Sequence, residues 1–205
     1  MFKLFILVLL LNFYWANADC SADAKKIAYC YDITFFAPNL TMSHDAQSFH
    51  ADFLKNILPD YEKNFADMCQ KKTAFDKCVT NTTINACFNT QDFKNVQFTN
   101  GKESDARTFV ATYLQMDYVC GRAYNMIANL YHCANMMQSN CSAETVRYAT
   151  CTTADDYTTC TMPLATKQCG IASACLYKKF LALETCNQPD LNCDSCSSIT
   201  AANKT

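Results

Sequence analysis

Two cysteines and a histidine lie within the stretch MDYVCGRAYNMIANLYHC, which runs from Met116 to Cys133. Thiolate and imidazole groups bind zinc, and a thiolate beside an imidazole can act as a nucleophile. At about 100° per residue, Cys120 and Cys133 lie roughly 220° apart around a straight helix, so one metal ion cannot reach both. We therefore favour two disulfides to different elements, with Cys141 as the expected partner of Cys133.

Other patterns that carry chemistry are absent from the sequence. It contains no G-x-S-x-G nucleophile elbow, no H-E-x-x-H zinc motif and no adjacent cysteine pair of the kind secreted phospholipases use. The single C-x-x-C, at 193–196, stands alone in a polar segment, and we interpret it as structural. His44, His50 and His132 have no ligand spacing among them. We expect no catalytic residue, no metal site and no cofactor, and we predict that the protein is not an enzyme.

The amino end has the pattern of a secretory signal peptide at residues 1–18. Lys3 is followed by a mostly apolar run at 4–15 and by the small-residue cleavage site Ala16-Asn17-Ala18. The apolar run is shorter than the roughly 20 residues that a spanning helix needs. We expect a secreted, extracellular protein without a membrane anchor.

The chain that remains after cleavage begins at Asp19 and has 187 of the 205 residues. Without Lys3 it carries 16 basic and 19 acidic side chains, a net charge of −3, which argues against a nucleic-acid partner. Its length fits one domain. We predict a cysteine-rich domain at 19–186 and an irregular tail at 187–205.

All 15 cysteines lie in this secreted portion, where an oxidising compartment favours disulfides. The number is odd, so one thiol lacks an intrachain partner and could link two chains as a dimer. We expect that thiol among Cys175, Cys186, Cys193 and Cys196. Disulfides are predicted at Cys20, Cys30, Cys69, Cys78, Cys87, Cys120, Cys133, Cys141, Cys151, Cys160 and Cys169.

Only three glycines occur in the sequence, which is too few for the tight turns of a β-sandwich or barrel. We predict an all-α, disulfide-rich bundle of about five to seven helices. Apolar residues at helical spacing place helices at 22–36, 43–58, 60–79, 104–137, within 142–160, and from Pro163 to about 185. Residues 80–103 are predicted to form a long polar loop with a short helix around Cys87.

The helix at 104–137 has the most regular pattern. Its apolar stripe repeats with spacings of three and four from Phe109 to Ala134 and includes Cys120, which we therefore expect to face the core. Ser104 is the predicted N-cap. N-glycosylation is predicted at Asn39, Asn81 and Asn140, each of which begins an N-x-S/T sequence.

The cysteine frame resembles a known family. Cys20 and Cys30, at the first predicted helix, have nine residues between them, and MCQKKTAFDKC at 68–78, DYVCGRAYNMIANLYHC at 117–133 and TTCTMPLATKQCG at 158–170 follow. Together they are similar to the secreted cysteine-rich helical family of nematodes known as domain of unknown function nineteen. The resemblance implies a secreted, mainly helical fold and no known catalytic residues. A related family of eggshell proteoglycans attaches chondroitin at Ser-Gly, and that dipeptide is absent here.

Two functions without catalysis stay open. The first is an extracellular binding or interaction protein whose partner is an unknown protein. The second is a carrier of a small apolar ligand held between helices. The carrier would line its cavity with the aromatic residues that recur on the predicted helices, Phe49, Phe53, Phe65, Phe109, Tyr113 and Phe180.

Overall fold

The computed structural model describes residues 20–36, 42–57, 61–126, Cys141 and 151–185. Every regular element in these ranges is helical, and four disulfides join them, which confirms the predicted all-α, disulfide-rich fold. None of the described helices is long and apolar enough to cross a membrane. The predicted signal peptide and the predicted irregular tail both lie outside the described residues.

The described residues form seven α-helices and two 3₁₀ helices. In chain order they are α2 (Cys20–Thr34), α3 (Ala46–Ile57), α4 (Tyr61–Val79), α5 (Asn81–Cys87), α6 (Thr90–Phe93), the 3₁₀ helix η1 (Gln97–Thr99), α7 (Glu103–Cys120), the 3₁₀ helix η2 (Tyr124–Met126) and α9 (Cys151–Thr185).

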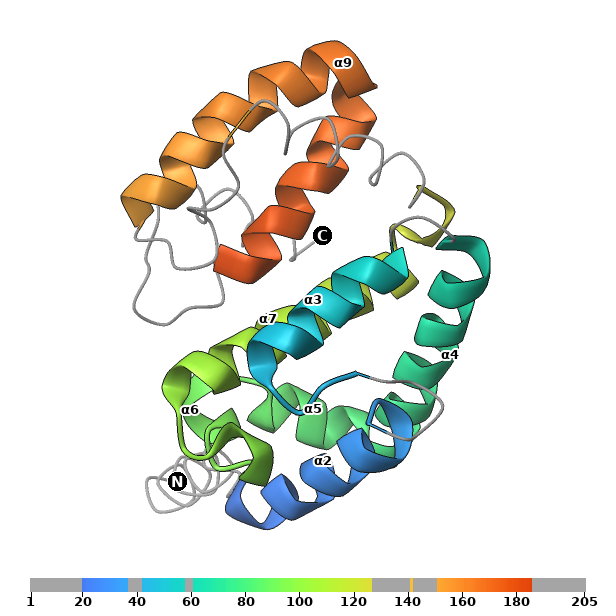
Figure 1. Ribbon diagram of the computed structural model, residues 1–205, viewed down its shortest axis with the longest axis vertical. Coiled ribbons are helices and arrows are strands. Elements are labelled where there is room, and N and C mark those ends of the chain that lie inside the picture. The colour runs from blue at the N-terminus through green and yellow to red at the C-terminus, as the bar shows by residue number, and fades with distance from the viewer. Residues whose placement is uncertain (1–19, 37–41, 58–60, 127–140, 142–150, 186–205) are drawn as a thin grey trace, which may run out of the picture.

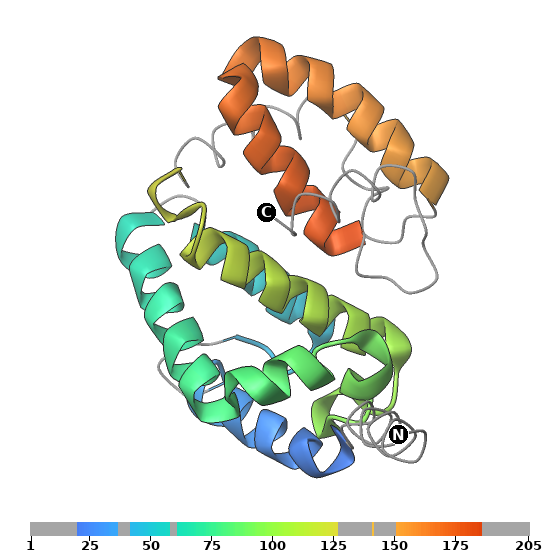
Figure 2. The ribbon, with the colours of Figure 1, turned by 180° about the vertical axis from the view of Figure 1, so that it is seen from behind.

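Helices α3 and α7 run side by side through the middle of the molecule (Figures 1 and 2). Helix α4 flanks them, α2 and α5 lie at one end, and α9 packs on α7 at the other end. The fold therefore places the elements from α2 to η2 in one body, against which α9 forms a second layer.

The core of this body is aromatic. Helix α2 buries Ala24, Ile27, Ala28 and Tyr31 at helical spacing, which turns one face inward. The Tyr31 ring is fully buried, and the rings of Phe75 in α4, Phe98 in η1 and Phe109 in α7 lie within 5.7 Å of it, centroid to centroid. Residues from four elements thus meet at one ring, and this contact fixes α2 and η1 against the central helices.

The predicted loop at 80–103 contains α5, which matches the short helix expected around Cys87, but it also contains α6 and η1, which were not predicted. Its polar composition concealed short helices that depend on local hydrogen bonds and on a few buried anchors. Asn89 caps α6 by accepting a hydrogen bond from the Asp92 backbone N–H, and Phe93 is fully buried. The spacing of apolar residues cannot reveal helices of four to seven residues, because such helices are too short for the apolar pattern to repeat.

Helix α7 is shorter than the predicted helix at 104–137. It begins after Lys102, so Ser104 is not its N-cap, and it ends at Cys120. Gly121 leaves the helical conformation, with φ −103° and ψ −97°, and a Cβ there would lie 2.9 Å from the Asp117 carbonyl oxygen. Residues 127–137 lie outside the described residues, so the rest of that predicted helix is untested.

Helix α9 also differs from the prediction, which placed a helix start at Pro163. Pro163 lies inside α9, and the chain bends instead at Gly170, where φ is 80° and ψ is 163°. This conformation is nearly restricted to glycine, because a Cβ would clash with the local backbone. The bend gives α9 the two limbs that are seen in Figure 1.

Candidate binding cleft

The disulfides determine which cysteine sulfurs are available as nucleophiles or metal ligands. Cys120 at the end of α7 is bonded to Cys69 in α4, so its sulfur is neither a nucleophile nor a free metal ligand. Its side chain is partly buried against the core, as the apolar stripe predicts. His132 and Cys133 lie outside the described residues. The predicted Cys133–Cys141 bond is wrong, because Cys141 is bonded to Cys160 across a separation of 19 residues.

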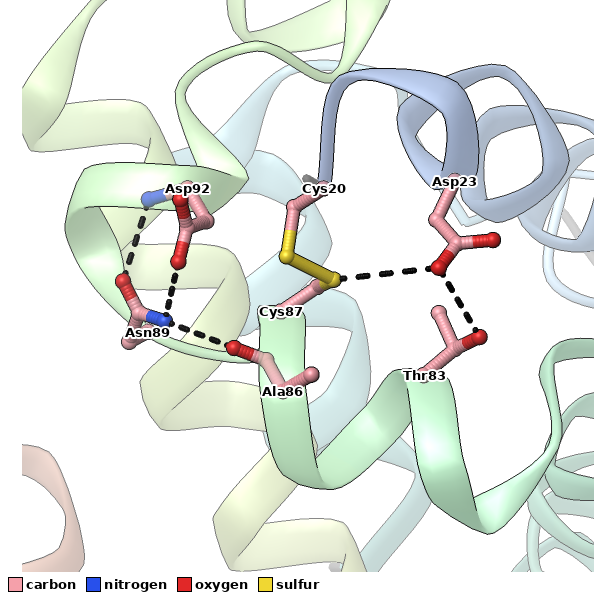
Figure 3. Close-up of a disulfide and its surroundings, with 7 residues drawn as sticks. All are labelled: Cys20, Asp23, Thr83, Ala86, Cys87, Asn89 and Asp92. Carbon is pink, nitrogen blue, oxygen red and sulfur yellow. Dashed lines mark hydrogen bonds between the residues drawn. A yellow bond between two sulfur atoms is a disulfide. The ribbon is translucent and has the colours of Figure 1, made fainter. Parts of the chain in front are cut away.

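Two further bonds attach α2 to the body. Cys20 pairs with Cys87 at the end of α5, and Cys30 pairs with Cys78 in α4. Beside the first bond, the Thr83 hydroxyl donates to the Asp23 carboxylate at 3.2 Å, which adds a polar contact between α2 and α5 (Figure 3). Because the bonds lie near both ends of α2, the position of this helix on the body is fixed.

The remaining cysteines are of three kinds: disulfide-bonded, free, or outside the described residues. Cys169 is disulfide-bonded. Cys175 is a free thiol and is exposed, and it belongs to the C-terminal group in which the sequence places the leftover thiol. The side chains of Cys133, Cys151, Cys186, Cys193 and Cys196 lie outside the described residues.

The described residues contain no group of three or more histidine, cysteine or acidic side chains that could hold a metal ion. His50 is buried, and its Nδ1 lies 3.0 Å from the Thr112 hydroxyl of α7 and its Nε2 3.9 Å from Glu184 of α9. Since Thr112 Oγ1 donates to the Thr108 carbonyl, it accepts from His50 Nδ1–H. His50 thus joins three helices and is a core residue.

The six aromatic residues that a carrier would use are packed within the described core. Phe49 and Phe109 have ring centroids 4.9 Å apart, Phe53 lies 6.3 Å from Phe180, and Phe65 lies 5.1 Å from Tyr124. Tyr113 lies 5.8 Å from Phe75. These rings contact one another or neighbouring rings, as expected of residues that fill a core.

A partly buried charged cluster that the sequence did not predict joins α4 to α7. The Lys72 ammonium contacts the carboxylates of Asp76, at 2.7 Å, and Asp117, and the Tyr113 hydroxyl donates to Asp76 at 2.9 Å. Burial lowers the pKa of Lys72, but hydrogen bonds to Asp117 and Asp76 outweigh burial and raise it above its usual value. Every charged group in the cluster has a partner, so the cluster stabilises the helix pair and offers no unpaired group for catalysis.

A polar cleft of about 530 Å³ lies on the described surface. Three segments form it: α2, the residues that precede α3, and the turn from η1 into α7. The lining residues are Ala28, Asp32, His44, Asp45, Gln97, Phe98, Asn100, Lys102 and Asp105, and we refer to them together as the cleft. They span much of the chain from α2 to α7, so they meet only after folding.

The wall before α3 is held by hydrogen bonds and by ring stacking. Asp45 accepts from the Ser48 backbone N–H at 2.8 Å, as an N-cap does, and its own N–H donates to the Ser43 hydroxyl at 3.1 Å. The hydrogen bonds from Ser48 hold the pKa of Asp45 below its usual range, so this carboxylate is charged at neutral pH. The His44 ring stacks on Phe36 with centroids 3.9 Å apart.

The opposite wall is the turn between η1 and α7. Asn100 and Gly101 adopt positive φ, of 52° and 72°, which turns the chain sharply after η1. The Thr99 hydroxyl is buried and lies 2.8 Å from the Lys94 and Val96 carbonyl oxygens. Phe98 contacts the Tyr31 and Phe109 rings of the core. The cleft is therefore built on rigid supports.

The charged side chains that line the cleft are mostly acidic. Its lining includes three carboxylates, from Asp32, Asp45 and Asp105, and one ammonium, from Lys102. It has no serine, cysteine or threonine that a histidine could activate as a nucleophile.

Of the three predicted glycosylation sites, one lies among the described residues. Asn81 is exposed at the start of α5, and Asn39 and Asn140 lie outside the described residues.

No family model, no curated protein and no solved structure matches this chain. The resemblance to the nematode family therefore stays a prediction.

Proposed function

We propose that this chain is a secreted, non-catalytic extracellular protein that binds another protein through the cleft. The observation that carries the proposal is the cleft itself: a polar hollow of about 530 Å³ on walls held by a helix cap, a buried threonine and a cross-linked helix. A preformed site loses little conformational entropy on binding, so it suits recognition.

The extracellular part of the proposal is supported by the disulfides and by the signal-peptide pattern. Disulfides persist in oxidising compartments and are rare in the cytosol. Four of them have both cysteines among the described residues, and three of these join helices across separations of 48 to 67 residues. The apolar run and small-residue site at 1–18 supply a route to that compartment.

The competing function, a carrier of a small apolar ligand, has less support. Its candidate lining residues pack on other rings in the core. The cleft is lined mostly by charged and amide side chains, and only Phe98, Ala28 and the His44 ring offer it apolar surface. Organic extraction of the purified protein and mass spectrometry would test the carrier directly, and a stoichiometric lipid would favour it over our proposal.

Site-specific photo-crosslinking tests protein binding at the cleft. A photoreactive residue replaces Gln97, which lines the cleft, and the matched control replaces Gln168, an exposed glutamine of α9 outside it. Each variant is incubated with the extracellular fluid in which the protein is found. We expect a discrete adduct from position 97 alone, and excess unlabelled protein should abolish it. No adduct, or the same adduct from both positions, would refute the cleft as the binding site.

A further inference from the structure

Helix α2 exposes two large apolar side chains on its outer face. Tyr29 is 60% exposed and Ile33 is 49% exposed, although most large apolar side chains among the described residues are buried. The two are four residues apart, so they are neighbours on the helix surface. We call this pair the α2 face. Contiguous exposed apolar surface on a folded protein commonly marks an interaction site.

The α2 face adjoins the cleft. Asp32 lies in the cleft wall, three residues after Tyr29, which places the two side chains roughly 60° apart around the helix. Ile33 follows Asp32 directly and lies on the far side of Tyr29. Asp32, in the cleft wall, and the apolar α2 face are therefore adjacent on the surface of the same helix.

The charged side chains of the cleft indicate the charge of the partner that covers this surface. The cleft carries three carboxylates against one ammonium, and in a hollow with protein walls such charges attract cations more strongly than on a flat surface. The whole chain has a formal charge of −2, so the general field also favours a positive partner. Lys25 and Lys26 on α2 are exposed, yet they do not line the cleft.

We propose that the partner presents a basic, amphipathic segment of polypeptide. One lysine or arginine of that segment enters the cleft between Asp32 and Asp105, and its apolar side chains cover Tyr29 and Ile33. This inference rests on the proposed function and names the chemistry of the partner. An anionic bilayer is the alternative occupant of an exposed apolar pair beside two lysines, and the carboxylates of the cleft oppose it.

Binding of synthetic peptides to the mature protein tests the inference. The probe is a peptide in which lysines alternate with leucines. The control peptides replace the lysines by glutamates or the leucines by serines. We expect the lysine–leucine peptide to bind at least about tenfold more tightly than either control, with an affinity that falls as salt is raised. Vesicles of anionic and of neutral phospholipid form a separate arm.

Variants locate the binding. The double substitution Asp32→Asn with Asp105→Asn removes two charges and keeps the shapes, and it should weaken binding about tenfold. Asp45 is left unchanged because it caps α3. Tyr29→Ser with Ile33→Ser should weaken binding by a similar factor, whereas Ile171→Ser, at a residue of α9 that is 74% exposed, should leave it unchanged.

The outcomes separate the two proposals. If the variants bind the lysine–leucine peptide as the wild type does, or if the glutamate peptide binds equally well, the basic-partner inference is refuted. Binding to anionic vesicles that is lost with Tyr29→Ser and Ile33→Ser would replace it by a membrane surface. If position 97 crosslinks a protein but the peptide does not bind, the cleft stands as the binding site and only the chemistry of its partner is wrong.

Discussion

Replacing Tyr31 by phenylalanine should stabilise the protein. The Tyr31 side chain is fully buried, and its hydroxyl is among the few buried polar atoms that have no hydrogen-bond partner. A buried hydroxyl without a partner costs about 1–3 kcal/mol, because it leaves its water bonds unreplaced. Phenylalanine keeps the ring and all its contacts with Phe75, Phe98 and Phe109.

The expected gain is smaller than the full penalty, since removing the oxygen also removes its packing contacts. We expect the free energy of unfolding to rise by about 1 kcal/mol, which corresponds to about 2–4 °C in the melting midpoint of a domain of this size. Urea unfolding of the mature protein with its disulfides intact measures this change, through the midpoint at unchanged slope.

Tyr113→Phe is the matched control. The Tyr113 ring is also buried, but its hydroxyl donates to the Asp76 carboxylate at 2.9 Å. Losing a hydrogen bond to a charged group should lower the free energy of unfolding by about 2 kcal/mol. The two substitutions delete the same atom and should change stability in opposite directions. If Tyr31→Phe destabilises the protein as much as Tyr113→Phe does, our account of the Tyr31 hydroxyl is refuted.

Four further predictions follow from the same contacts. Burial raises the pKa of Tyr31 and of Tyr113 above the usual 10.0. Above pH 10 the unfolded state therefore loses protons that the folded state keeps, so the free energy of unfolding should fall as the pH rises. Urea unfolding at a series of alkaline pH values measures this, and a free energy that does not change with pH would contradict it. Gly170→Ala should cost about 1–3 kcal/mol from backbone strain alone, because no atom beyond the adjacent residues of the chain lies within 4 Å of the added Cβ. Calorimetry measures this cost, and an unchanged midpoint would be inconsistent with the bend. Alkylation without reduction, followed by peptide mapping, should label Cys175, and failure to label it would mean that it is bonded, for example to a second chain. Glycosidase treatment should remove a glycan from Asn81, and replacing it by glutamine should lower the mass of the secreted protein by one glycan; an unchanged mass would disprove modification there.

The long helices could be predicted from the sequence because their apolar residues repeat and prolines mark their limits. The predicted ranges 22–36, 43–58 and 60–79 each differ from α2, α3 and α4 by three residues or fewer at either end. The bends were harder to predict. The apolar stripe continues through Gly121 to Ala123, which is fully buried, although α7 has already ended. Burial and helical continuity are separate properties, and periodicity reports only the first.

The cleft could not be predicted from the sequence. Asp32 and His44 come from neighbouring segments, but Asp105 is about 60 residues further along the chain, and tertiary packing brings the three together. The charged pair of Lys72 and Asp117 was missed for the same reason, since 45 residues separate its members. By contrast, the cysteines as a set indicated cross-linking without revealing any partner. Composition predicts the kind of bond, and only the folded chain selects the pairs.

The pattern of three of these disulfides has a consequence for the survival of the chain once it is cut. The Cys30–Cys78 loop lies inside the Cys20–Cys87 loop, and the Cys69–Cys120 bond begins inside both and ends beyond them. Every peptide bond from Cys20 to Cys120 is therefore enclosed by at least one covalent loop. A protease that hydrolyses a single bond in this span leaves two pieces that stay joined through sulfur. The cut body can keep both walls of its cleft in place until a reductant or a second cut arrives.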